Sequence, residues 1–396
     1  MNTLVALCAI GAEKILGNEI KHLGYSLAPS DAVRVPGRVT FFGDDDALFR
    51  ANLCLRTADR VFLQLAEFDA DNFDLLFDGI YSIPWQNYFK KDSRVVVDKI
   101  RVYKSRLDSE HTIQSMTQKA IYKKLCDVWR MSSMPESGIK SAVRIYVDND
   151  RVFVLLDLSG EPLHKRGYRT DGGQAPMRET TAAILLQYML WRRKTPLCDP
   201  FCGSGTIPIE AALYAMDVAP GLGRKFAVED LPFFDKKRGE QIRKAEAAKI
   251  RPDVEFHIAG SDIDSAAVDR AKLNAEHACV MAGRALQMIG SDQRIKRPDF
   301  VQADFKSLAA PFPEGLLLAN PPYGERLGDE AQAEALYREM ACLSSNFENW
   351  QMGFITSNKN FQKCFGRYAN LLKNIKSGAL DTCFYMFTNS AEKGKK

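Results

Sequence analysis

The chain has 396 residues, of which 46% are apolar and 26% charged, and its formal net charge is only +4. These values are ordinary for a globular protein of two or three domains, and they exclude a strongly basic field over the whole molecule. No apolar run reaches the roughly 18 residues of a membrane span, and residues 1–10 lack a basic leader, so we expect a cytoplasmic protein that contacts no membrane.

The nine cysteines, an odd number, are scattered along the chain. That distribution favours a reducing compartment over a disulfide framework. Cys198 and Cys202 are the closest pair, but no second cysteine or histidine pair accompanies them at ligand spacing. We therefore predict no metal site.

Charge is unevenly distributed over the N-terminal half. Residues 44–78 hold nine carboxylates and three arginines, whereas residues 90–144 hold thirteen cations and six carboxylates. The second stretch could attract phosphate while the first repels it. The same pattern is also typical of a solvated helix face, so charge alone leaves both interpretations open.

Strand and helix patterns alternate in the same half of the chain. Residues 95–102 predict a strand, and residues 109–128 predict a helix with one apolar face. Residues 142–147 and 152–156 predict two strands joined by a hairpin turn at 148–150. No proline- or glycine-rich linker marks a boundary between domains in this region.

A glycine turn follows a short predicted strand at 195–198. It runs from Asp199 to Thr206 with the sequence Asp-Pro-Phe-Cys-Gly-Ser-Gly-Thr, and a helical pattern follows at 207–216. A strand, a tight glycine turn and a helix form the ligand-binding corner of a doubly wound α/β sheet, where glycines let the backbone approach a ligand. The spacing matches neither the dinucleotide fingerprint nor a Walker loop.

Two further carboxylates close predicted strands at 255–262 and 300–305. Asp262 and Asp304 each stand where a strand would end, a position that suits either a ligand contact or a helix cap. The intervening segment 215–252 is much longer than a minimal crossover and contains a charged helical stretch at 236–249. We expect it to be an insertion near the site.

The tetrapeptide Asn320-Pro321-Pro322-Tyr323 ends the apolar run 316–319, where a buried strand would stop. The asparagine oxygen and the first proline's carbonyl can accept hydrogen bonds from an exocyclic amine, and the prolines stiffen the loop. The tyrosine offers a ring face for an unstacked base. Asn-Pro-Pro is also a common turn, but its pairing with the glycine turn is a strong signal.

The glycine turn followed by Asn-Pro-Pro-Tyr resembles the S-adenosylmethionine-dependent amino-methyltransferases. Three longer strings narrow the resemblance to the THUMP-domain 23S rRNA guanine-N2 methyltransferases, over nearly the whole chain: Ala219-Pro-Gly-Leu222, Gly260-Ser-Asp-Ile-Asp264 and Asn320-Pro-Pro-Tyr-Gly-Glu-Arg-Leu327. Some relatives have carried the label of N6-adenine-specific DNA methylase, because Asn-Pro-Pro-Tyr serves both chemistries.

The resemblance implies an α/β fold with a C-terminal Rossmann-like class I methyltransferase domain at 166–396. An α+β region would precede it, with a ferredoxin-like domain at 1–60 and an overlapping THUMP-like RNA-binding domain at 45–165. The implied cofactor is S-adenosyl-L-methionine. The implied partner is RNA, as 23S rRNA or a pre-ribosomal particle, with no obligate protein partner.

The resemblance also assigns roles to single residues. Asp262 would accept the ribose hydroxyls, with Asp264 as the alternative, and Asp304 would bind the adenine amino group. The implied cofactor-binding set is Asp199, Phe201, Gly203, Gly205, Thr206, Asp262, Ile263, Asp264, Asp304, Phe305 and Asn320. The implied catalytic set is Asn320, Pro321, Pro322 and Tyr323.

Candidate RNA contacts come from the basic N-terminal stretch and from the basic segment 163–169 that leads into the methyltransferase domain. They are Lys90, Lys91, Arg101, Lys104, Arg106, Lys123, Lys124, Lys165, Arg166 and Arg169.

Four functions compete on these observations. Guanine-N2 methylation of rRNA fits the family strings, and guanine-N2 methylation of tRNA shares the same chemistry. Adenine-N6 methylation of DNA is permitted by the tetrapeptide, but no DNA target-recognition domain is evident in the 73 residues after Tyr323. A non-catalytic RNA-binding assembly factor is disfavoured because every motif of the site is intact.

Overall fold

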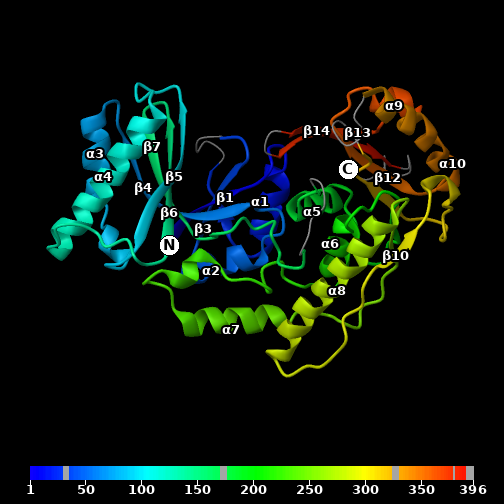
Figure 1. Cartoon of the computed structure of the whole chain (residues 1–396), viewed down its shortest axis with the longest axis horizontal. Helices are drawn as coiled ribbons and strands as arrows, with labels where there is room; N and C mark the ends of the chain where they lie inside the picture. The colour runs from blue at the N-terminus through cyan, green and yellow to red at the C-terminus, as the bar shows by residue number, and fades with distance from the viewer. Residues whose placement is uncertain (30–34, 170–175, 323–329, 378–379, 389–396) are drawn as a thin grey trace.

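The computed structural model describes residues 1–29, 35–169, 176–322, 330–377 and 380–388. Two seven-stranded sheets organise the chain, one formed before residue 160 and one after it (Figure 1). Tyr323, a predicted catalytic residue, and the adjoining Gly-Glu-Arg-Leu string lie outside the described residues. Across the described ranges, every helix is too short or too polar to span a lipid bilayer.

The first sheet has the strand order β2-β3-β1-β4-β7-β6-β5, and within the described residues all its pairings are antiparallel except that of β5 with β6. Its strands are β1 (Asn2–Leu7), β2 (Ser26–Leu27), β3 (Arg38–Gly43), β4 (Arg60–Asp69), β5 (Arg94–Tyr103), β6 (Lys140–Asp148) and β7 (Arg151–Asp157). Its helices are α1 (Glu13–His22), α2 (Asp45–Cys54), α3 (Phe73–Ser82), the 3₁₀ turn η1 (Trp85–Asn87) and α4 (Glu110–Trp129).

Local sequence explains the β6–β7 hairpin and the start of helix α4. The β6–β7 turn places Asn149 at φ 50° and Asp150 at φ 63°, both left-handed, which is the backbone that a two-residue hairpin needs. Ser109 caps α4 by accepting a hydrogen bond from the Thr112 N–H at 3.2 Å. The predicted strand, helix and hairpin are therefore confirmed.

Helices α3 and α4 cover one face of β4–β7 (Figure 1). Helix α4 donates from the Gln114 side chain to the Val97 carbonyl at 2.6 Å and from Gln118 to Val95 at 2.8 Å. Side chains alternate along a strand, and Val95 and Val97 face the helices. A register shift between Val97 and Lys99 inserts one residue, so Lys99 lies on the opposite face of the sheet.

The second sheet has the order β10-β9-β8-β11-β12-β14-β13, with β14 antiparallel to both of its neighbours. Its strands are β8 (Leu197–Asp199), β9 (Ile258–Asp262), β10 (Asp299–Gln302), β11 (Leu316–Ala319), β12 (Gln351–Thr356), β13 (Leu371–Ser377) and β14 (Leu380–Phe387). The sequence order reverses between β8 and β11, which makes their carboxyl ends the place where such sheets bind ligands.

Helices cover both faces of the second sheet. On β11, Leu316 and Leu318 join the core under α5, α6 and α8, whereas Leu317 and Ala319 join the core under α9, α10 and α11. Burial on both faces explains why this strand is a continuous apolar run. The helices are α5 (Glu179–Tyr188), α6 (Thr206–Ala215), α8 (Ser265–Gln287), η3 (Phe305–Ser307), α9 (Glu330–Glu339), η5 (Met340–Cys342), α10 (Leu343–Asn346) and α11 (Phe361–Phe365).

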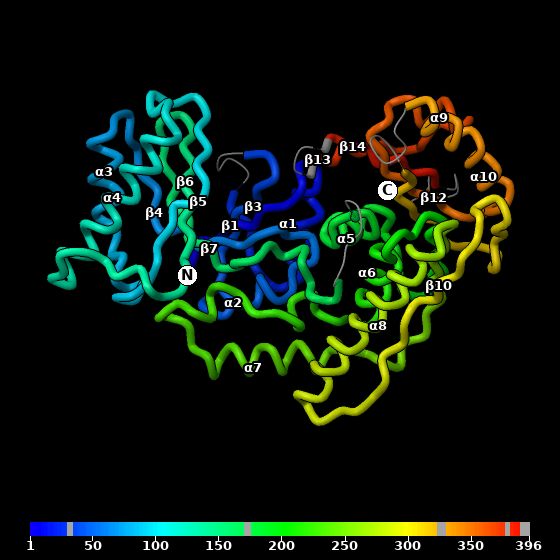
Figure 2. Tube along the Cα trace, in the orientation of Figure 1, coloured from blue at the N-terminus to red at the C-terminus, as the bar shows by residue number. Residues whose placement is uncertain are grey.

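The segment 215–252 packs against the N-terminal half, so its predicted place near the site is wrong. It contains η2 (Ala227–Asp230) and α7 (Lys236–Ala247), and α7 runs beside α2 (Figure 2). Two ion pairs hold α7 there, Arg238 with Asp46 at 2.5 Å and Glu246 with Arg50 at 2.9 Å.

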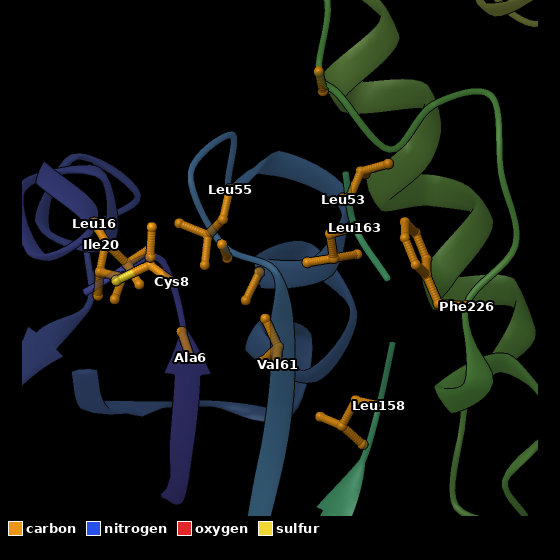
Figure 3. Packing of buried hydrophobic residues seen from close by; sticks show 14 of the residues in the cluster. Ala6, Cys8, Leu16, Ile20, Leu53, Leu55, Val61, Leu158, Leu163 and Phe226 are labelled. Carbon is orange, nitrogen blue, oxygen red and sulfur yellow. The ribbon is translucent and has the colours of Figure 1, made fainter. Parts of the chain in front are cut away.

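A shared core joins the two halves. Phe226, just before η2, lies beside Leu53 of α2 (Figure 3). Leu163 lies in the same cluster and belongs to the connecting segment, by which we mean the chain between the end of β7 and the start of α5. An antiparallel bridge between Ile10 and Lys376 also connects the first half to β13. The predicted domain limits, 1–60, 45–165 and 166–396, stay a prediction.

Candidate active site at the carboxyl ends of β8 to β11

The glycine turn lies at the carboxyl end of β8 and leads directly into α6. The Cys202 N–H donates to the Ser261 carbonyl at 2.9 Å, and the Gly205 N–H donates back to the Cys202 carbonyl at 2.8 Å. These two bonds fix the turn against the end of β9. Within the described ranges, no group of three or more metal-ligating side chains is assembled.

The two glycines of the turn are needed for different reasons. Gly203 has φ 52°, and a Cβ built on it would meet no atom within 4 Å, so the backbone there borders open space. Gly205 has φ 82°, and a Cβ would stand 2.9 Å from the Phe300 ring. The first position lets a ligand approach the main chain, and the second lets β10 pack closely.

Two carboxylates make this end of the sheet electronegative. Asp199 is only 2% exposed, and burial, together with the charge of Asp262, raises the pKa of its carboxyl well above the usual range. Asp262 accepts hydrogen bonds from the N–H groups of Gly203 at 2.9 Å and Asp264 at 3.0 Å. The raised pKa of Asp199 favours its neutral form, and a cationic ligand at the turn would stabilise the ionised form instead.

The two candidates for the ribose contact have different surroundings. Asp264 caps α8 by accepting from the Ala266 N–H at 2.9 Å, and it pairs with Arg270 at 3.5 Å. Asp262 faces the glycine turn instead, and its carboxylate keeps lone pairs for a hydroxyl. The side chain of Ile263, between them, is exposed.

Asp304 and its neighbour close the next strand end. The Asp304 side chain accepts from the Lys306 N–H at 2.9 Å at the start of η3, which holds one of its oxygens in a cap. Phe305 is buried, and its ring centroid lies 5.1 Å from that of Phe201 in the glycine turn. The ring pair brings β10 and the glycine turn together.

Asn320 follows β11, at the switch point. Among the residues that the structure describes, its side-chain oxygen Oδ1 is buried without a hydrogen-bond partner. A buried acceptor without a donor is costly and rare in native proteins. The next residues form a rigid support, because Pro321 is buried and the Pro322 carbonyl accepts from the Tyr337 hydroxyl at 3.2 Å. No pattern in the sequence predicts this contact of Tyr337.

Thr206 is the first residue of α6, and a residue of the connecting segment, Arg169, forms a hydrogen bond with its side chain. Its hydroxyl accepts from the Arg169 guanidinium at 2.7 Å, and Arg169 also lies 3.5 Å from Glu179. Burial raises the pKa of the Glu179 carboxyl to about 7. These contacts largely enclose the Arg169 guanidinium, and the suggestion that it binds RNA stays a prediction.

Arg166 was also predicted to bind RNA, and this prediction is wrong. The side chain is 1% exposed and donates to the carbonyls of Leu163, at 2.7 Å, and Arg56. It lies 3.6 Å from the buried Glu210. A guanidinium enclosed in this way fixes the connecting segment and cannot reach a phosphate in solvent.

The remaining predicted RNA contacts lie at the surface but do not form one patch. Lys123 and Lys124 are on α4, on the helix-covered face, and Lys123 pairs with Asp127 at 2.8 Å. Arg106 pairs with Asp71 at 2.6 Å, and Lys165 pairs with Glu161 at 2.5 Å. The others are Lys90, Lys91, Arg101 and Lys104, which precede, lie on or follow β5.

A Rossmann-like sheet that carries a glycine turn, carboxylates at successive strand ends and Asn-Pro-Pro at its switch point defines an S-adenosylmethionine-dependent methyltransferase. Residues 166–383 match the model of the RMKL-like methyltransferase domain, and residues 3–62 match the RlmL ferredoxin-like domain. The chain belongs to the RMKL-like methyltransferase family, so the resemblance found in the sequence is confirmed.

Two relatives illustrate the range of the family. The chain is 36% identical to YpsC of Bacillus subtilis (strain 168), which is provisionally named an RNA methyltransferase, over 100% of this chain and 98% of that one. It is 32% identical to the ribosomal RNA large subunit methyltransferase K/L of Aliivibrio salmonicida (strain LFI1238), over 99% of this chain but 54% of that one. The chain thus spans about half the length of the K/L relative.

A solved structure supports the fold over the full length. SMU.472, crystallised in complex with SAH, is 32% identical to this chain, with 98% of each chain covered and a TM-score of 0.85.

Proposed function

We propose that this protein transfers a methyl group from S-adenosyl-L-methionine to the exocyclic N2 amine of a guanosine in 23S rRNA. The observation that carries the proposal is the buried and unpartnered oxygen of Asn320 at the switch point. An exocyclic amine has two N–H donors, and one of them would satisfy this acceptor.

The residues around the glycine turn fit the cofactor. Bound S-adenosyl-L-methionine supplies a methyl group that is already activated on a positively charged sulfur. Asp262 provides acceptor oxygens beside the turn, Gly203 opens the backbone to close approach, and Asp304 has acceptor capacity for an amino group. The positive sulfur of the cofactor would favour the ionised form of the buried Asp199. Together these residues bind and orient, and none of them has to take up a proton.

Asn320 acts on the amine that receives the methyl group. The lone pair of that nitrogen is delocalised into the base, so the nitrogen is a weak nucleophile. A hydrogen bond to the Asn320 oxygen draws one N–H out of the base plane and leaves the lone pair directed at the methyl carbon. Holding the two reactants in line contributes several kcal/mol, and the proton leaves after transfer.

RNA as the substrate is supported by the names of the relatives, and 23S rRNA by the K/L relative in particular. The choice of guanine N2 rests on the Asn-Pro-Pro-Tyr-Gly-Glu-Arg-Leu string, because the Asn320 oxygen would accept from the exocyclic amine of guanine and of adenine alike. Guanine-N2 methylation of tRNA and adenine-N6 methylation of DNA remain the alternatives that an experiment must separate.

Labelled methyl transfer tests the function directly. The protein is incubated with S-adenosylmethionine labelled in its methyl group and with undermodified rRNA, tRNA or genomic DNA, and the nucleosides are then analysed. We expect label in N2-methylguanosine of large-subunit rRNA. The same nucleoside in tRNA would change the substrate but keep the chemistry, whereas methyladenine in DNA would contradict both.

Replacing Asp262 with asparagine should weaken cofactor binding about ten- to a hundred-fold, because a carboxylate that accepts hydroxyl groups is worth roughly 1.5–3 kcal/mol. Titration calorimetry with S-adenosylhomocysteine measures the change. Asp264→Asn is the matched control, since asparagine also caps a helix and Asp264 faces α8. A stronger effect of Asp264→Asn would assign the ribose contact to Asp264 instead.

A further inference from the structure

A cavity of about 870 Å³ lies on the face of the first sheet opposite α3 and α4. Strands β5, β6 and β7 form one wall, and the segments 7–10 and 35–38 form the other. Pro162, His164 and Arg178 of the connecting segment complete it. Of the RNA contacts predicted from the sequence, only Arg101 lines this cavity.

Strand register places cations and aromatic rings in adjacent rows on this wall. Lys99 stands opposite Arg144, and in the next row Arg101 stands opposite Tyr146, which in turn pairs with Phe153. Tyr103, at the end of β5, is 60% exposed. A phosphate backbone and its bases need this combination of charge and ring faces.

Positive charge exceeds negative charge in the lining. Six cations, Arg38, Arg60, Lys99, Arg101, Arg144 and Arg178, face two carboxylates, Asp59 and Asp148. Four of them have carboxylate partners. Arg60 pairs with Asp157, and Arg178 lies 3.8 Å from Asp59. Arg144 lies 3.5 Å from Asp98, and Arg101 lies 3.8 Å from Glu110 in a pair whose two side chains are both more than half exposed. Within the described residues, Lys99 and Arg38 form no ion pair.

Two of these arginines have buried donors for which the described part of the chain offers no acceptor. Arg144 is 6% exposed, its guanidinium lies 4.8 Å from the centre of the Phe62 ring, and its Nε has no acceptor. Arg38 lies 4.8 Å from the centre of the Phe153 ring, and its Nε and Nη1 have none. These guanidinium groups contribute positive charge to the wall of the cavity, but their enclosed N–H groups do not themselves reach a ligand in it.

The pKa shifts of groups that line the cavity agree with a positive electrostatic potential there. The pKa of Lys99 is lowered by burial and by the charges of Arg101 and Arg144. Burial also lowers the pKa of Arg38. The pKa of His164 falls to about 4 through burial and through the cations around it, Arg178 first among them. An anion in the cavity would offset these penalties.

We propose that this cavity binds a single-stranded segment of the RNA substrate, with phosphates at Lys99 and Arg101 and bases against Tyr103 and Tyr146. The inference rests on the proposed function, because it assumes that RNA is the substrate. A double helix keeps its bases inside, so the exposed rings would have nothing to stack on. The helix-covered face, with Lys123 and Lys124, takes no part.

Salt-dependent binding tests the proposal. The full-length protein is titrated against a fluorescent oligouridylate between roughly 50 and 200 mM salt, a range in which phosphate contacts are strongly screened. Lys99→Ala/Arg101→Ala should weaken binding at least about ten-fold at low salt and reduce the slope of log affinity against log salt by about 1.4, since each lost contact contributes about 0.7. Lys123→Ala/Lys124→Ala and the matched control Lys236→Ala/Lys237→Ala on α7 should leave both unchanged.

Tyr103→Ala gives a second, independent readout. It should weaken binding at least about five-fold at every salt concentration without changing the slope, because stacking is uncharged. Equal binding of the Lys99/Arg101 pair and wild type, a larger effect of the α4 pair, or tighter binding of duplex than of single-stranded RNA would each overturn the proposal. S-adenosylhomocysteine binding checks that every variant is folded.

Failure of this inference can be told apart from failure of the proposed function. Oligouridylate binding requires no methyl transfer, so the cavity is tested even if the target nucleotide is misassigned. A wild-type protein that methylates rRNA while its Lys99/Arg101 variant binds normally would refute the cavity alone. A protein that methylates DNA and no RNA would refute the proposed function.

Discussion

Replacing Asn320 with alanine is expected to lower the rate of methyl transfer at least about a hundred-fold, while binding of S-adenosylhomocysteine changes by less than about three-fold. The side-chain oxygen is buried, unpartnered and placed at the switch point between β8 and β11. Loss of one polar contact that acts on the transition state typically costs 10²–10³ in rate, or about 2.7–4 kcal/mol. The cofactor contacts at the glycine turn would persist, because they come from other strand ends.

Single-turnover kinetics with saturating RNA measure this loss without interference from product release. Asn87→Ala is a suitable control, since Asn87 is exposed at the end of η1, far along the chain from the site. A fully active Asn320→Ala variant would refute the proposed role of the oxygen. Equal loss of cofactor affinity and rate would instead make Asn320 a cofactor contact.

Replacing Arg166 with methionine is expected to lower the free energy of unfolding by about 3–5 kcal/mol, the usual cost of removing one partner from a buried charge pair. Methionine keeps much of the volume, but Glu210 loses the cation that lies 3.6 Å away. The carbonyls of Leu163 and Arg56 lose their donor as well. The connecting segment would then no longer be fixed to α2 and α6.

Urea denaturation of wild type and variant gives the difference in stability. Lys165→Met is the matched control, because Lys165 is exposed and its pair with Glu161 is a surface pair worth less than about 1 kcal/mol. A stable Arg166→Met variant with weakened RNA affinity would restore the role that the sequence suggested. We expect the opposite, a destabilised protein whose RNA affinity is normal at temperatures where it is folded.

Much of the fold and of the site could be predicted, because the determining features are local. The apolar run that became β11 is buried on both faces, and Asn320 follows it as expected. The glycine turn requires left-handed backbone at Gly203 and Gly205, which only glycine adopts readily. These signals lie within a few residues of each other in the sequence.

Long-range packing could not be predicted in the same way. The charge pattern of a basic segment does not predict which of its side chains point into the protein, and the burial of Arg166 and Arg169 is therefore not evident from the sequence. Nor could the cavity have been recognised, since Arg38 and Arg144 come from separate strands and meet only in the folded sheet. The partner of a charge is a property of topology, and composition does not specify it.

The position of β4 limits where the chain can be divided into fragments that fold separately. This strand is hydrogen-bonded to β1 on one side and to β7 on the other. A gene broken near codon 60 would therefore encode two fragments, each with an unpaired strand prone to aggregation. A break after β7 would keep every strand pairing of the first sheet, but it would separate α7 from α2 and divide the shared core between two fragments.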